Sequence, residues 1–504
     1  MKSGKLANKF WSWVVPVVLI AVFCLSPLAT NTLTPSAAAT VYAAPSYQYS
    51  SNWYEELGVV DYNNYLYALQ NTSPLKTVTV AVIDSGLDYT SNPVFKDRVN
   101  IEDARNFNLT GGRTTQDWNI DESGHGTHVA GIIAAGSMAN VQILPIRIFV
   151  GTDNSMNFSH FVDAINYVAN NAKALNIVAC NLSLGTIGIA ADQDKRVFEA
   201  AFNKDLGNYQ PYINRLRRAG VLPVVAAGNI DTQAGETEAK SYYSFPASCE
   251  GAVSVSAYYR DNHGIAKRAY FSYYNERVTL SAPGLEIWSA CSSNIIPDDP
   301  TQLIEEGDDL YYFQKADGNY AHVRAIDTDG DGVADYYNLR LRGTSMATPF
   351  VTLCYALICG DPTKTTADAL GVEWDADVDT QAPYYYLNPQ HKALLLKATD
   401  FYLEDAVGKT DVYFGYGGVN VKAFAQDDVT PSIAKDPSSP SLPAYVPSDV
   451  GTTQEIQNWA SVFWILIGMT LVMALIGFLR GCAVRKRGVI SEVDENGEDE
   501  DDDE

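Results

Sequence analysis

The chain has 504 residues, 46% of them hydrophobic and 19% charged, a balance typical of a globular protein with a large core. Its formal net charge of −25 argues against a nucleic-acid-binding protein, because such an acidic chain lacks a basic surface for phosphates. The seven cysteines include no Cys-x-x-Cys pair, and five of them lie between the apolar runs at 13–25 and 459–479. We therefore expect no disulfide framework, although a Cys249–Cys291 bridge is compatible with the sequence.

Residues 1–44 are typical of a secretory signal peptide. Three lysines precede the apolar run Trp13–Leu25, and three consecutive alanines at 37–39 follow as a cleavage site. A retained membrane anchor is the alternative, but the apolar run is short for a membrane span. Residues 45–75 then form an N-terminal extension.

The first predicted strand, Thr77–Ile83, is a run of β-branched and small apolar residues that ends at Asp84. A buried parallel strand of this kind delivers the carboxylate that follows it to the C-terminal edge of a sheet. The segment Gly124–Gly131 (GHGTHVAG) opens a helix of small residues, with His125 in its first turn.

Strands and helices alternate in the next hundred residues. Apolar runs predict strands at 142–149, 177–184 and 221–227, and amphipathic patterns predict helices at 158–175 and 197–219. This order predicts an α/β fold with a doubly wound parallel sheet flanked by helices. The loops beyond the C-terminal strand ends would then form the active cleft.

Ser345 stands in the segment Arg342–Pro349 (RGTSMATP), directly before the apolar run Phe350–Leu357, which we expect to be helical. Gly343 allows a tight bend, and the unpaired N–H groups of a helix start favour an oxyanion beside the hydroxyl. An isolated Gly-Thr-Ser would more often be an ordinary helix cap. With Asp84 and His125 in the same chain, however, Ser345 completes the nucleophile, base and orienting carboxylate of a catalytic triad.

Six motifs in this order resemble the subtilisin-like serine protease (subtilase) family: VIDSGLD at 82–88, GHGTHVAGIIAA at 124–135, NLSLG at 181–185, VVAAGN at 224–229, APG at 282–284 and GTSMATP at 343–349. The resemblance implies a serine endopeptidase, with Asn229 as the side-chain donor of the oxyanion hole. It also implies two segments that flank the substrate's P1 side chain, namely Ser183, Leu184, Gly185, Ala226, Ala227 and Gly228. Phe350 stands where the family often has histidine, outside the triad.

The segment 52–69 resembles the amphipathic opening of mature family members. Too few residues separate it from the expected cleavage site for the folding propeptide that secreted members commonly carry. Two alternatives follow. Either the protease folds without an intramolecular chaperone, or its short N-terminal arm lies across the cleft.

A predicted peptidase domain at 76–426 contains an insertion at 285–341. In its segment DTDGDGVAD, four carboxylates surround a glycine turn with the spacing of the first part of a calcium loop: Asp327, Asp329, Asp331 and Asp335. We therefore expect a structural Ca²⁺, although Asn338 stands where a bidentate glutamate is usual, and a solvated acidic turn is the alternative. His125 and His128 could also form a metal pair, but no third ligand accompanies them.

The C-terminal part predicts membrane attachment. Residues 427–458 form a stalk rich in proline and serine, and 459–479 form an uncharged apolar run long enough for one transmembrane helix. A basic flank and an acidic tail follow at 480–504, which places this end in the cytoplasm. The layout resembles that of the mycosins, subtilases attached to a mycobacterial-type secretion system.

The sequence thus predicts a single-pass cell-membrane serine endopeptidase whose catalytic domain is extracellular and whose substrates are proteins or peptides. The alternative from another class is a catalytically silent calcium-binding surface scaffold on the same fold. The sequence does not specify the oligomeric state.

Overall fold

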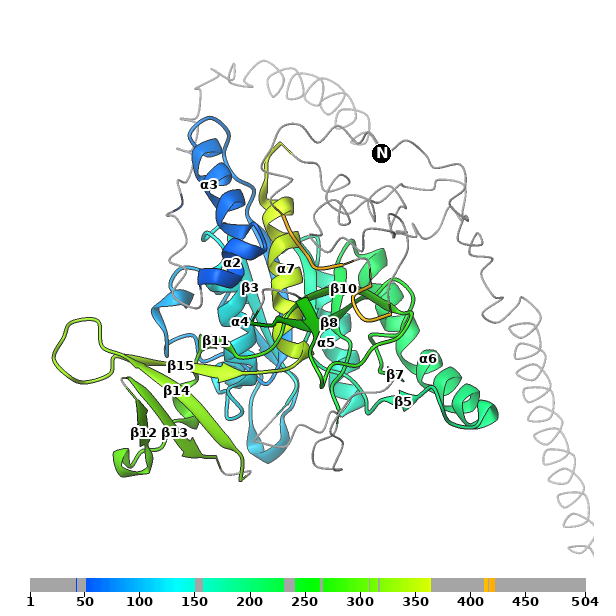
Figure 1. Cartoon of the computed structure of the whole chain (residues 1–504). Helices are drawn as coiled ribbons and strands as arrows, with labels where there is room; N and C mark the ends of the chain where they lie inside the picture. Colours follow the sequence, from blue (N-terminus) through cyan, green and yellow to red (C-terminus); the bar gives the residue numbers. More distant parts are fainter. Residues whose placement is uncertain are drawn as a thin grey trace, which may run out of the picture. The chain divides into compact units, whose positions relative to one another are not determined.

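A computed structural model describes residues 42, 51–149, 157–230, 241–262, 266–307, 309–315, 318–363, 412–415 and 417–421 (Figure 1). The predicted signal peptide apart from Tyr42, and the predicted stalk, transmembrane helix and tail, lie outside these residues. Within the described ranges, no helix is both long enough and apolar enough to cross a membrane.

The central sheet has the strand order β10-β8-β6-β4-β1-β3-β2, and every neighbouring pair along this path is parallel. A short strand, β9, pairs antiparallel with β8 outside the path. The strands are β1 (Val78–Asp84), β2 (Arg105–Asn106), β3 (Val141–Arg147), β4 (Ile177–Leu182), β6 (Leu222–Ala226), β8 (Val253–Arg260), β9 (Ala266–Arg268) and β10 (Val278–Pro283). The predicted α/β fold with a mainly parallel central sheet is confirmed.

Helices cover both faces of this sheet. On one face α2 (Ser51–Glu56), α3 (Val59–Leu69), α4 (His125–Ala135) and α7 (Thr344–Gly360) share a core with Val80 and Val82 of β1. On the other face α5 (Phe158–Asn171) and α6 (Lys195–Arg218) share a core with Ala81 and Ile83. Successive side chains of a strand point to opposite faces, so a strand that is covered on both sides is apolar throughout.

The N-terminal helices belong to the same core as the sheet. The Tyr54 hydroxyl of α2 donates to the Ile132 carbonyl at 3.0 Å, and the Tyr62 hydroxyl of α3 donates to the buried Asp361 carboxylate at 2.8 Å. These partners lie in the C-terminal part of α4 and just after α7, whereas Ser345 and His125 lie at the N-terminal ends of the same helices. The described segment 51–69 therefore does not lie across the cleft, and it packs as part of the domain from which the sequence analysis separated it.

The insertion folds into a second sheet, which Figure 1 shows beside the central one. Its antiparallel strand order is β11-β15-β14-β13-β12, with β11 (Ile287–Ala290), β12 (Ile304–Gly307), β13 (Leu310–Gln314), β14 (Tyr320–Ile326) and β15 (Tyr336–Leu341). It packs on α4 at Gly131, where a Cβ atom would lie 2.4 Å from the Ser289 hydroxyl oxygen. A two-stranded sheet of β5 (Ile189–Ala190) and β7 (Tyr242–Tyr243) completes the fold.

The five cysteines of the described core are buried free thiols: Cys180, Cys249, Cys291, Cys354 and Cys359. The Cys249–Cys291 bridge that the sequence allowed is not formed. The segments around Cys249 and Cys291 are therefore held by packing and not by a disulfide bond.

Candidate active site

Asp84 is the last residue of β1 and lies at the C-terminal edge of the central sheet. Its side chain is buried, and its Oδ1 atom accepts a hydrogen bond from the Ser85 N–H at 2.8 Å. The same oxygen lies 2.7 Å from Nδ1 of His125. Because a carboxylate only accepts, Nδ1 of His125 carries the proton and Nε2 remains an acceptor.

His125 is the first residue of α4, and its side chain is 29% exposed. Burial by itself would lower the pKa of His125, but the charge of Asp84 and its hydrogen bond outweigh burial, so the pKa of His125 is raised above its usual value. The imidazole is thus oriented by a buried carboxylate, while the accessible part of its side chain can meet a substrate. This is the arrangement of a general base.

Ser345 is the second residue of α7, where backbone N–H groups lack partners inside the helix. Pro349, four residues later, has no N–H to give to the Ser345 carbonyl, as a normal helix residue would. The Ser183 hydroxyl replaces it and donates to that carbonyl at 2.8 Å. The Ser345 hydroxyl itself donates to the Ser183 carbonyl at 3.3 Å, and the hydrogen bonds of the described residues include none between Ser345 and His125.

Asn229 follows β6 and faces the start of α7. Its Oδ1 atom accepts the Thr344 N–H at 2.9 Å, which fixes the orientation of the side-chain amide. The Nδ2 group is thereby left as a donor beside Ser345. Gly228 has a φ of +110°, which favours glycine, and its N–H donates to the Thr344 hydroxyl at 3.1 Å.

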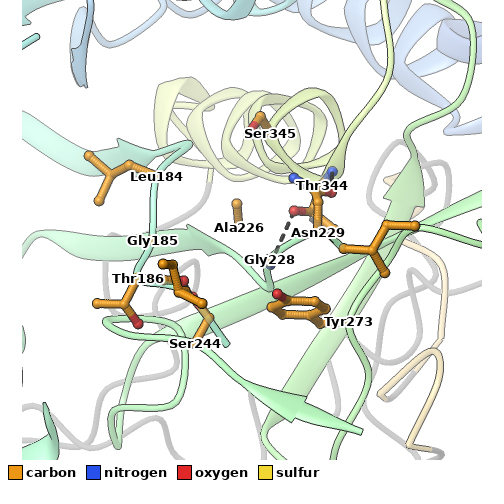
Figure 2. A pocket seen from close by; sticks show the side chains of 12 residues that line it. Leu184, Gly185, Thr186, Ala226, Gly228, Asn229, Ser244, Tyr273, Thr344 and Ser345 are labelled. Carbon is orange, nitrogen blue, oxygen red and sulfur yellow. Dashed lines mark hydrogen bonds between the residues drawn. The ribbon is translucent and has the colours of Figure 1, made fainter. Parts of the chain in front are cut away.

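A pocket of about 320 Å³ opens beside these residues and includes both Asn229 and Ser345 in its wall (Figure 2). Four of the six residues predicted to flank a P1 side chain line it, namely Leu184, Gly185, Ala226 and Gly228. The other two do not. Ser183 instead bonds the backbone of Ser345, and Ala227 is buried with its N–H donating to the Val255 carbonyl.

The remaining pocket residues are Thr186, Ile187, Ile230, Ser244, Tyr273 and Thr344, which the sequence analysis did not assign to the pocket. The Tyr273 ring closes one side because two glycines leave room for it. A Cβ on Gly228 would lie 2.4 Å from the ring, and one on Gly188 would lie 2.5 Å from it. The glycines were visible in the sequence, but the aromatic residue that fills their space lies 45 or more positions later.

The acidic loop of the insertion brings together three of its four predicted ligands. Carboxylate oxygens of Asp327, Asp329 and Asp335 lie within 4.8 Å of one another, and all three residues are exposed. Asp331, the fourth predicted ligand, is not part of this group. Backbone hydrogen bonds from Gly332 and Gly330 lower the pKa of Asp327, so the carboxylate is ionised at neutral pH. Three clustered oxygens fit the chemistry of a calcium ion.

His128 is not available as a metal ligand beside His125. Its Nε2 atom donates to the carbonyls of Ile287 and Leu339, at 3.0 and 3.1 Å, and so ties α4 to the inserted sheet. Burial lowers the pKa of His128 to about 3, so the ring is neutral at pH 7. The alternative of a His-x-x-His metal pair is therefore not supported.

A buried carboxylate that bonds a partly exposed histidine, and a serine at a helix start in a pocket wall, are chemical groups that a hydrolase can use on an α/β fold. The family model described as the subtilase family matches residues 75–417, and the chain belongs to this family. It is 32% identical over 233 residues to alkaline protease 1 of Aspergillus flavus, which covers 45% of this chain and 47% of that protein. It is 27% identical over 253 residues to a subtilisin-like protease of Coccidioides posadasii, covering 49% of this chain and 52% of that protein.

The chain thus spans about half the length of the curated relatives it matches. Among solved structures, it is similar to fervidolysin from Fervidobacterium pennivorans, with a TM-score of 0.45 and 20% identity, over 75% of this chain and 44% of that chain. It is also similar to a lanthipeptide protease, with a TM-score of 0.44 and 20% identity, over 77% of this chain and 98% of that chain.

Proposed function

We propose that the chain is a serine endopeptidase in which Ser345 is the nucleophile, His125 the general base and Asp84 the orienting carboxylate. The observation that carries the proposal is the 2.7 Å hydrogen bond between Asp84 and His125, and the shared pocket of Ser345 and Asn229 supports it. It leaves Nε2 of His125 unprotonated, which is the form that can take a proton from a serine. The family relationship supports the same chemistry.

In this mechanism the Ser345 hydroxyl turns from the Ser183 carbonyl toward His125 and attacks the carbonyl carbon of a peptide bond. The long 3.3 Å bond to Ser183 costs little to break, and catalytic hydrogen bonds often tighten only when the substrate is bound. His125 takes the serine proton and passes it to the leaving amine. Asn229 Nδ2 and the Ser345 N–H then stabilise the oxyanion of the tetrahedral intermediate.

A fluorophosphonate probe tests this proposal, because it reacts only with an activated serine. We expect the protein to be labelled, and Ser345→Ala and His125→Ala to lose the label while they stay folded. A folded protein without any label would favour the alternative of a catalytically silent calcium-binding scaffold. Cleavage of peptide libraries would then give the preference at P1 for the labelled enzyme.

We further propose that the enzyme acts at the outer face of a cell membrane, held by a helix at 459–479 and a stalk at 427–458. The support is the composition of these segments, and the resemblance of the layout to the mycosins points the same way. A stalk of about thirty residues at about 3 Å per residue reaches at most about 90 Å, so substrates would lie near the membrane. Protease treatment of intact cells should remove the catalytic domain and spare an epitope after Glu504. Loss of that epitope would show the opposite orientation.

The acidic loop adds a proposed Ca²⁺ site formed by Asp327, Asp329 and Asp335. Its support is the convergence of three carboxylates around the turn at Gly330. The ion would hold the turn between β14 and β15 and take no part in peptide hydrolysis. Its role would therefore be structural.

A further inference from the structure

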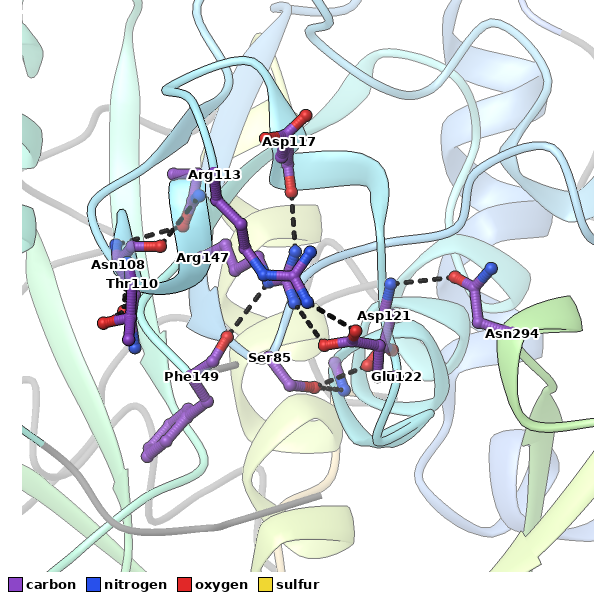
Figure 3. Close-up of polar contacts among 12 residues, drawn as sticks. Ser85, Asn108, Thr110, Arg113, Asp117, Asp121, Glu122, Arg147, Phe149 and Asn294 are labelled. Atoms are coloured by element: carbon purple, nitrogen blue, oxygen red, sulfur yellow. Dashed lines mark hydrogen bonds and ion pairs between the residues drawn. The ribbon is translucent and has the colours of Figure 1, made fainter. Parts of the chain in front are cut away.

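The carboxylate of Asp121 lies where the loop after β1 meets the first turn of α4 (Figure 3). Its Oδ1 atom accepts the Ser85 hydroxyl at 2.8 Å and the Gly124 N–H at 2.9 Å. Its Oδ2 atom accepts the N–H and the hydroxyl of Thr127, at 2.8 and 2.6 Å. The side chain is fully buried, so these four protein groups replace water around the carboxylate.

The direction of the two hydroxyl protons follows from the other bonds of the hydroxyls. The Ser85 hydroxyl oxygen accepts the Gly126 N–H at 2.9 Å, and the Thr127 hydroxyl oxygen accepts the Asp88 N–H at 3.0 Å. Each hydroxyl has a single proton, which is free to point at Asp121. Burial raises the pKa of Asp121, whereas its hydrogen bonds from Thr127 and Ser85 lower it, because all four partners donate and so stabilise the ionised carboxylate.

These bonds brace the two elements that hold the proposed catalytic pair. Ser85 directly follows Asp84, and Gly124 and Gly126 flank His125. The loop and the helix are in close contact, since a Cβ on Gly126 would lie 2.2 Å from the Gly86 carbonyl oxygen. A shift of either element would therefore break bonds to Asp121 and lengthen the bond between Asp84 and His125.

We propose that Asp121 is a positioning residue for peptide hydrolysis, which braces the loop of Asp84 against the helix of His125 and places a second negative charge near the imidazole. The inference rests on the proposed function of this site. Asp121 does not touch the substrate and acts through Ser85 and the first turn of α4. Its charge favours the imidazolium that forms when His125 takes the serine proton.

The charged groups that face His125 come from three elements. Asp84 from β1 and Asp121 from the loop before α4 raise the pKa of His125, and Lys315 after β13 lowers it. His128 of the same helix is neutral. Arg147, the buried partner of Asp84 in the β1–β3 register, bonds Glu122 and the carbonyls of Phe149 and Asp117, so its charge is already compensated (Figure 3).

The test is Asp121→Asn in the full chain, which keeps the size of the side chain but removes its charge and two of its acceptor sites. We expect kcat/KM per labelled active site to fall by about 10- to 100-fold, because misplacement of a base has costs of this order. We also expect the acid limb of the pH profile to move to lower pH. Asp361→Asn is the matched control, a buried carboxylate at the far end of α7 that accepts from Tyr62 and Thr363.

Asp361→Asn should lose stability without moving the acid limb. If Asp121→Asn shows the same acid limb and the same kcat/KM per active site as Asp361→Asn, the inference is overturned. Ser85→Ala serves as the second variant, should Asp121→Asn not fold. It keeps the charge of Asp121 but removes the hydrogen bond from the Ser85 hydroxyl, so it should lower kcat and leave the acid limb in place. An unchanged kcat would contradict the positioning role of Asp121.

A histidine titration by NMR in the Ser345→Ala background separates this inference from the proposed function. Asp121→Asn should lower the pKa of His125 in that inactive protein as well. The shift would be seen even if Ser345 were not the nucleophile. If Asp121→Asn leaves the pKa of His125 unchanged in the Ser345→Ala background while the wild-type chain cleaves peptides, the inference is overturned and the proposed function stands.

Discussion

The side-chain amide of Asn229 gives the most direct test of how the oxyanion is stabilised. Its Oδ1 atom is held by the Thr344 N–H, so Nδ2 is the group that can face the developing charge. Asn229→Ala removes this donor, and loss of one oxyanion-hole donor typically lowers kcat by about 100- to 1,000-fold, or about 3–4 kcal/mol. The KM should change little, because the bond forms mainly in the transition state.

The same substitution also removes the hydrogen bond to Thr344, and this structural cost has to be separated from the catalytic one. Asn229 is exposed, so water can replace the lost acceptor, and the loss of folding stability should be about 1 kcal/mol or less. Thermal unfolding measures this loss. Peptide hydrolysis, expressed per mole of folded protein, measures kcat.

Asn229→Asp is the matched control, because it keeps an acceptor for the Thr344 N–H but presents a carboxylate oxygen in place of the donor. It should fold at least as well as Asn229→Ala and lose at least as much kcat. An Asn229→Ala enzyme with the kcat of the wild type would refute the assignment. The oxyanion would then have to be stabilised by backbone groups alone.

Three further outcomes are expected. Ca²⁺ should raise the melting temperature and EGTA should reverse the rise, and this gain should be lost in Asp329→Ala and largely kept in Asp331→Ala. A melting temperature that does not respond to Ca²⁺ would show that the loop is a solvated acidic turn. His128 is neutral in the folded protein with a pKa of about 3, but it takes a proton near pH 6.5 when unfolded, so the free energy of unfolding should fall as the pH drops from about 6.5 toward 3. This residue can contribute at most about 1.4 kcal/mol per pH unit. In His128→Asn, the free energy of unfolding measured with urea should depend less steeply on pH over this range. Ser183→Ala should destabilise the wild type by about 1–3 kcal/mol and the Pro349→Ala protein by less, since the introduced alanine has the backbone N–H that proline lacks. Equal losses in a double-mutant cycle would contradict the conclusion that the Ser183 hydroxyl replaces this N–H as the donor to the Ser345 carbonyl.

The parts of the fold that could be predicted from sequence are those specified by local pattern. The run before Asp84 is apolar on nearly every position because both faces of β1 are covered, and this is visible in seven consecutive residues. The strands and helices between His125 and Asn229 alternate with similar clarity, and their predicted bounds agree with the observed ones within a few residues at most ends. Their order implies a parallel sheet in which the C-terminal ends of the strands lie at the same edge.

The parts that could not be predicted depend on side chains that meet across long stretches of chain. Asp121 and Ser85 are 36 positions apart, and nothing in either segment alone shows that the two side chains share a hydrogen bond. The inserted sheet was expected only as an insertion, because its strands are short and partly exposed and so lack a clear apolar face. Asp331 has the spacing of a ligand, yet its Oδ1 atom accepts the Val333 N–H and it stays outside the cluster.

The proline of the GTSMATP motif shows why a break in a local rule can be informative. A proline inside a helix leaves one carbonyl without its N–H partner, and an uncompensated loss costs about 3 kcal/mol. In α7 that carbonyl belongs to Ser345, and the hydroxyl of Ser183 supplies the missing donor from the segment after β4. The same break thus joins the proposed nucleophile to the chain segment that continues into the pocket at Leu184 and Gly185. A helix with alanine in place of Pro349 would be locally better, because the alanine N–H could pair with the Ser345 carbonyl, but it would no longer require the hydroxyl of Ser183 at that carbonyl.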